Sequence, residues 1–139
     1  MKTLDTLIRV HEWKLNEERR KLADLIGLSD ELRECVSRIE QEIQSEGALT
    51  DQSIDAARSY STFLKSQMQR RETLESSMAK VETQIAEIQE RVAAAFKELK
   101  TYEISRDRRN AAMARERARR EQSSLDEIAL NMHRMKSGG

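Results

Sequence analysis

Apolar residues recur along the middle of the chain at alternating spacings of four and three residues. They are Leu74, Met78, Val81, Ile85, Ile88, Val92, Ala95, Leu99 and Tyr102. This spacing lines the residues up along one side of an α-helix and is typical of a coiled-coil seam. Because an apolar seam needs cover from another helix, the pattern predicts a long helix that pairs with a second one.

A second run with the same spacing begins near the N-terminus. Its positions are Leu4, Ile8, His11, Leu15, Glu18, Leu22, Leu25, Ser29, Leu32, Val36, Ile39 and Ile43. Gly27 and the Ser29-Asp30 pair resemble a helix break followed by a new N-cap. The heptad phase nevertheless continues unchanged from Leu25 to Leu32, so we predict one helix over residues 2–45.

The heptad phase of the first helix ends just before Gly47, which predicts a turn over residues 46–50. Gly47 suits the left-handed position that follows many helices, and Thr50 or Asp51 suits the N-cap of the next helix. We therefore expect a second helix over residues 51–136. The predicted fold class is all-α.

Residues 1–139 are expected to form a single coiled-coil domain, a two-helix antiparallel hairpin with a longer second helix. A short turn pairs residues whose numbers sum to about 97, so that Leu22 faces Leu74. Under this register Gln67 and Arg71 lie opposite Ser29, and the polar residues of both helices form one layer. Mispairing would bury these groups against leucine. The pattern thus favours a monomeric hairpin over a parallel homodimer.

Residues 98–136 extend beyond the predicted end of the first helix. Arg106 and Arg109 occupy the seam there. A new apolar stripe then begins two residues out of phase, and it consists of Ala111, Ala114, Ala118, Leu125, Ile128, Met132 and Met135. The change of phase indicates that this overhanging extension is built for a different partner.

Composition agrees with an elongated helical protein. Proline is absent, and hydrophobic residues make up 37% and aromatic residues only 4% of the chain. Lys+Arg and Asp+Glu balance at 25 each, so net charge gives no preference for a polyanion. The single Cys35 excludes an internal disulfide and fits a reducing compartment. No apolar run is long enough to span a bilayer or to form a signal peptide, so we expect a cytoplasmic protein.

Residues for catalysis or metal binding do not cluster in the sequence. His11 and His133 lie near opposite ends, and there is no glycine-rich phosphate loop or nucleophile–base pair. His11 falls on the seam, which predicts a half-buried structural histidine. Coiled coils also lack a concave pocket. We therefore expect no enzymatic activity, no small-molecule substrate, no cofactor and no metal.

The stretch Arg106–Arg120, called the arginine segment below, is strongly basic. Against two acidic residues it contains seven arginines, Arg106, Arg108, Arg109, Arg115, Arg117, Arg119 and Arg120. One interpretation is a solvated helix supported by ion pairs such as Glu116–Arg120 and Arg117–Glu121. Another is an electrostatic contact with an acidic protein surface. Nucleic-acid binding is the weakest interpretation, because no aromatic residue is interleaved for base stacking.

Trp13 is the only tryptophan and lies at the outward f position of the first helix, with Val10 one turn earlier on the same side. An outward pair of large apolar residues is typical of a spot that anchors a binding partner. The alternative is a tryptophan that lies on its own helix without a partner.

Two segments carry a resemblance to a known family. The first is Leu7–Leu15, with the letters LIRVHEWKL, and the second is Glu121–Ala129, with the letters EQSSLDEIA. With these segments on either side of a single turn, the chain resembles the flagellar export protein FliJ family over nearly its whole length.

The resemblance implies a non-catalytic component of the bacterial flagellar type III export apparatus, cytoplasmic and peripherally associated with the membrane. Such a component is similar in shape to the central stalk of rotary ATPases. The implied partners are a hexameric export ATPase, a membrane protein of the export gate, and export chaperones. By the rotary analogy, the end that carries both termini enters the ATPase ring, and the turn points toward the gate.

The residues expected to contact partners are Arg106, Arg109, Arg115, Arg117, Arg119, Arg120, Leu125, Ile128 and Met132, with Val10 and Trp13 as a further docking spot. Two alternatives stay open. One is a homodimeric structural coiled-coil adaptor without an ATPase partner, and the other is a stalk homologue of an injectisome.

Overall fold

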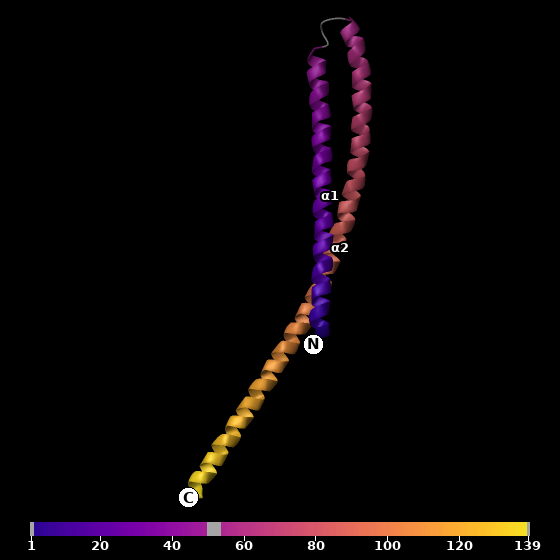
Figure 1. Cartoon of the computed structure of the whole chain (residues 1–139). Coiled ribbons are helices and arrows are strands. Elements are labelled where there is room, and N and C mark those ends of the chain that lie inside the picture. The colour runs from indigo at the N-terminus through magenta and orange to yellow at the C-terminus, as the bar shows by residue number, and fades with distance from the viewer. Residues whose placement is uncertain (1, 50–53, 139) are drawn as a thin grey trace. The chain divides into compact units, whose positions relative to one another are not determined.

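The computed structural model describes residues 2–49 and 54–138, which form two α-helices. The first, α1, spans Lys2–Ala48, and the second, α2, spans Ile54–Ser137. The helices pack against each other as a hairpin (Figure 1), which confirms the all-α fold. α1 runs through Gly27 without interruption, as the unchanged heptad phase predicts.

The chain divides into two units, which are described separately. One unit is Trp13–Ala95, and the other combines Met1–Glu12 with Phe96–Gly139. In the first unit the magenta part of α2 runs beside the purple part of α1 (Figure 1). In the second unit the yellow end of α2 continues with no other helix next to it (Figure 1).

The buried apolar side chains all lie on the two predicted seams. They are Ile8, Leu15, Ile39, Val81, Ile88 and Leu99. Among the described residues, no large side chain is completely buried, because one helix covers only one side of another. The core is therefore a single row of residues along each helix, and its stability depends on each seam position.

The predicted pairing register is wrong. Gln67 Nε2 donates a hydrogen bond to Glu42 Oε2 at 3.2 Å, and Arg71 Nη2 lies 3.0 Å from Glu40 Oε1. Neither polar residue faces Ser29, so the proposed polar layer does not form. Ser29 is instead a buried polar residue of the α1 seam.

The turn explains the difference in register. α1 continues through Gly47, and no described glycine has a positive φ, so the expected left-handed cap is absent. The N–H of Leu49 donates to the carbonyl of Glu46 at 3.2 Å. A Cβ added to Gly47 would lie 3.1 Å from Tyr60 Oη, so Tyr60 is the residue of α2 beside this end of α1.

The start of α2 therefore extends past the end of α1. A given residue of α2 faces a residue of α1 that lies about two heptads closer to the turn than predicted, as Arg71 does with Glu40. Arg33 Nη2, for example, lies 3.8 Å from Glu82 Oε1. The expected caps Thr50 and Asp51 lie outside the described residues.

Replacing Gly27 by alanine is expected to stabilise the protein by about 0.5–1 kcal/mol, because alanine loses less backbone entropy in a helix. A Cβ at Gly27 has nothing within 4 Å, whereas a Cβ at Gly47 meets Tyr60 Oη at 3.1 Å. Gly47→Ala is therefore the matched control with a smaller gain. Thermal unfolding followed by circular dichroism measures both, and an equal or larger gain for Gly47→Ala would contradict this explanation.

Candidate partner-binding surface

The N-terminal turns of α1 pack on α2 around His11. Its ring stacks on Tyr102 with centroids 4.7 Å apart and planes inclined by 21°, and its Nδ1 lies 3.3 Å from Glu98 Oε2. His11 is 8% exposed, so it is buried more deeply than predicted. These contacts within one unit are those of a structural histidine.

Cover by α1 reaches further along α2 than residue 98. Leu99 is buried, Tyr102 is half-buried, and Arg106 and Arg109 are also half-buried. Arg106 Nη2 pairs with Asp107 Oδ1 at 3.3 Å. The Nε atom of Arg109 is buried and has no hydrogen-bond partner. These two arginines therefore mark the end of the covered part of α2.

Residues 110–138 form the uncovered extension, and every residue in it is exposed except the half-buried Glu116. Arg119 donates two hydrogen bonds to Glu116, at 3.1 Å from Nε and 2.8 Å from Nη2, and Arg120 Nε donates another at 3.3 Å. The predicted Glu116–Arg120 pair is thus present. Among the described residues, Arg117 and Glu121 form no ion pair.

The hydrogen bonds around Glu116 also change its electrostatics. The bond from Arg119 lowers the pKa of Glu116, burial opposes this effect, and Arg120 lowers the pKa further. In return, Glu116 raises the pKa of Arg119. The three-residue cluster is therefore intact at neutral pH and is lost only as the pH falls through the lowered pKa of Glu116. Exposed helical ion pairs of this kind contribute little to stability.

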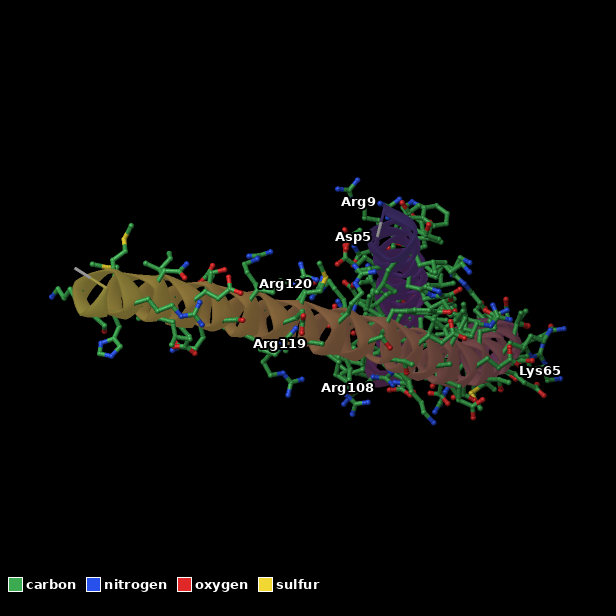
Figure 2. The ribbon with its side chains drawn as sticks, turned by 90° about the horizontal axis from the view of Figure 1, so that it is seen from below. Asp5, Arg9, Lys65, Arg108, Arg119 and Arg120 are labelled. Carbon is green, nitrogen blue, oxygen red and sulfur yellow. The ribbon has the colours of Figure 1, made fainter. Side chains whose placement is uncertain are left out.

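The remaining exposed arginines of the segment carry unneutralised charge. Among the described residues, Arg108, Arg115 and Arg117 make no ion pair, and all three are exposed. Figure 2 shows the labelled Arg108 projecting from the ribbon, as do Arg119 and Arg120 further along. The arginine segment can therefore offer charge to an acidic surface without breaking internal pairs.

The predicted apolar stripe of the extension is uncovered along its whole length. Leu125, Ile128, Met132 and Met135 are each more than half exposed, and the stripe alanines are exposed as well. Leu130 is also more than half exposed but lies off the stripe, so the spacing of apolar residues does not point to it. An uncovered row of large apolar residues on a charged helix marks a surface for a partner.

On α1, Val10 is 42% and Trp13 is 64% exposed. These exposed fractions agree with the outward positions that the heptad phase predicts for both residues. A largely exposed tryptophan is the type of residue that anchors a protein interface.

A further apolar group, with exposed aliphatic and half-buried aromatic side chains, lies near the turn, and sequence reasoning missed it. The rings of Tyr60 and Phe63 lie 6.4 Å apart, next to the exposed Leu49. Ile54, at the start of α2, is 77% exposed. Two aromatic residues at helical spacing beside the turn were the available signal, and we call this group the turn surface.

Other kinds of site are absent from residues 2–49 and 54–138. No group of His, Cys, Asp or Glu side chains there could hold a metal ion. Neither helix, as far as it is described, has a stretch long and apolar enough to cross a membrane.

The sequence model of the family described as "Flagellar FliJ protein" matches residues 1–138. No curated protein and no solved structure matches the chain.

Proposed function

Since the chain belongs to the FliJ family of flagellar proteins, a family of export-related coiled coils, we propose that it binds the hexameric export ATPase through its uncovered extension. In this proposal the protein promotes assembly or activity of the ATPase ring and has no catalytic role of its own. It acts in the cytoplasm, next to the membrane-bound export gate and the export chaperones.

One observation carries the proposal, namely that α2 continues from residue 110 to its end without cover from α1. Free arginines and a row of large exposed apolar residues on one uncovered helix are typical of a surface that binds a partner. The helical part of the extension, residues 110–137, has 28 residues and is about 42 Å long, which is enough to reach into the pore of a protein ring.

Charge and apolar contact have different roles in this interface. The free arginines Arg115 and Arg117 accelerate encounter with an acidic surface through long-range attraction. The apolar stripe, with Leu125, Ile128 and Met132, then supplies the buried contact that slows dissociation.

Two further contacts belong to the proposal. Val10 and Trp13 are each docking residues of α1 in this proposal, and each is supported by the exposure of its own side chain. The turn surface is the candidate contact for the export gate, supported by the exposed Leu49 and Ile54. Each offers apolar side chains that the hairpin itself leaves uncovered.

The test is a binding measurement between the full-length chain and the purified export ATPase of the same bacterium, combined with the rate of ATP hydrolysis. We expect a stable complex and faster hydrolysis, because a rod that fills the pore favours the closed ring. Trp13→Ala is expected to weaken binding about tenfold, as truncation of an anchoring tryptophan does.

A parallel measurement with an unrelated hexameric ATPase serves as the control. Absence of binding to the export ATPase at low ionic strength would overturn the proposal. Binding to both enzymes with equal affinity would reduce it to nonspecific charge attraction.

A further inference from the structure

The apolar stripe of the extension is uncovered, and the order of its residues makes it complementary to a second copy of itself. With Glu121 included, its positions alternate by three and four residues without a gap, as in a coiled coil. They are Ala111, Ala114, Ala118, Glu121, Leu125, Ile128, Met132 and Met135. The first half is small and the second half is large, so the stripe is complementary to its own reverse.

We propose that the extensions of two chains pair with each other as an antiparallel coiled coil centred on Ser123. In such a pair the core layers join residues at equal distances on either side of the centre. The layers are Ala111 with Met135, Ala114 with Met132, Ala118 with Ile128, and Glu121 with Leu125, each residue meeting the other chain's counterpart.

Side-chain size selects this arrangement. Every layer of the antiparallel pair except the central one joins an alanine to a long apolar side chain, so the helices stay at a constant separation. A parallel pair would instead place alanine against alanine in one half and a large apolar side chain against its own copy in the other. Leu125, Ile128 and Met132 are more than half exposed in the single chain and would be covered by the second copy.

Charge selects the same arrangement independently. Within the paired region, residues 111–120 hold four arginines against Glu116, whereas residues 121–135 hold three acidic residues against Arg134. Antiparallel pairing places the basic half of one extension beside the acidic half of the other. Parallel pairing would place the two arginine segments side by side, and like charges would repel. Glu121 is the single polar core position, which fixes the register at some cost in stability.

This pairing leaves the hairpin of each chain intact, because it uses only residues 110–138. It covers the same stripe that the proposed function assigns to the ATPase. The extension therefore binds either a second copy of the chain or the ATPase ring. In the paired form the apolar stripe is buried until the ATPase binds it. The pairing itself does not depend on the ATPase proposal.

The first experiment measures the mass of the full-length chain, without ATPase, by sedimentation equilibrium over a wide range of concentrations. We expect the mass to rise from 16.1 kDa toward twice that value. Ile128→Asp should keep the chain monomeric. Leu130→Asp is the matched control, because both side chains are 54% exposed and only Ile128 lies on the stripe.

A monomer at every concentration would overturn the inference, as would equal dimerisation by the Ile128→Asp variant. Circular dichroism shows whether both variants keep their helices. Because only the isolated chain is measured, failure here leaves ATPase binding untouched, and failure of ATPase binding leaves the dimer untouched.

The second experiment determines the orientation by disulfide formation, in a background where Cys35→Ser removes the native thiol. One variant carries Ala114→Cys and the other carries Met132→Cys. Antiparallel pairing predicts that each variant alone gives little cross-linked dimer on oxidation, whereas a mixture of the two variants gives a large amount of it. Strong cross-linking of each variant alone would indicate a parallel pair and would overturn the proposed arrangement.

Discussion

Replacing Ile39 by aspartate is expected to destabilise the hairpin by about 3–5 kcal/mol. Ile39 is the most buried of the described core residues, at 2% exposure, and it lies on the α1 seam. Removing such a side chain costs about 2–5 kcal/mol, and a carboxylate left without a partner in its place adds to that. Since small domains have only about 5–15 kcal/mol in all, most of the stability is lost. Thermal and urea unfolding followed by circular dichroism measure the loss.

Ile26→Asp is the matched control for this substitution. Ile26 lies on the same helix but is 43% exposed, so the same change there should cost no more than about 1 kcal/mol, mostly through helix propensity. Equal losses for the two variants would show that the seam of α1 is not the core of the hairpin.

Reversing the charge of Arg115, Arg117, Arg119 and Arg120 to glutamate is expected to weaken binding to the export ATPase about tenfold or more and to reduce the stimulation of hydrolysis. Each substitution removes an attraction to an acidic surface and adds a repulsion, and the effect should appear mainly in the association rate. Binding kinetics at low and high ionic strength measure it, because salt screens exposed charges.

The sharpest comparison uses two double variants. Arg115→Glu with Arg117→Glu changes free charges of the extension, and Arg58→Glu with Arg70→Glu makes the same change of charge elsewhere on α2 at two exposed residues. Only the first pair should slow association. Unchanged stimulation by the quadruple variant, with helicity retained, would refute the charge part of the proposed interface.

The sequence was sufficient for the secondary structure and for the choice of core residues. The absence of proline and the heptad spacing of apolar residues both favour long helices. Ile39 and Ile88 are buried because the heptad phase places them on the inner side of their helices. His11 and Ser29 are buried for the same reason, although they are polar.

The candidate surface was predicted in part. Arg115, Arg117 and Leu125 lie in the exposed extension, as the change of stripe phase indicated. Arg106 and Arg109 do not, because they sit half-buried where α1 still covers α2. The sequence did not reveal which arginines are held by Glu116, because several acidic and basic residues at helical spacing compete for each other.

The sequence by itself determined the two helices, their inner sides and the polar character of the extension, because these follow from local preference and from periodicity. Only the tertiary structure decided the register, and with it where cover by α1 ends. A heptad pattern matches equally well after a shift of seven residues, so periodicity cannot distinguish one alignment from the next. The contact of Tyr60 with the end of α1 and the pairing of Arg71 with Glu40 fix that choice, and therefore the length of helix left free for a partner.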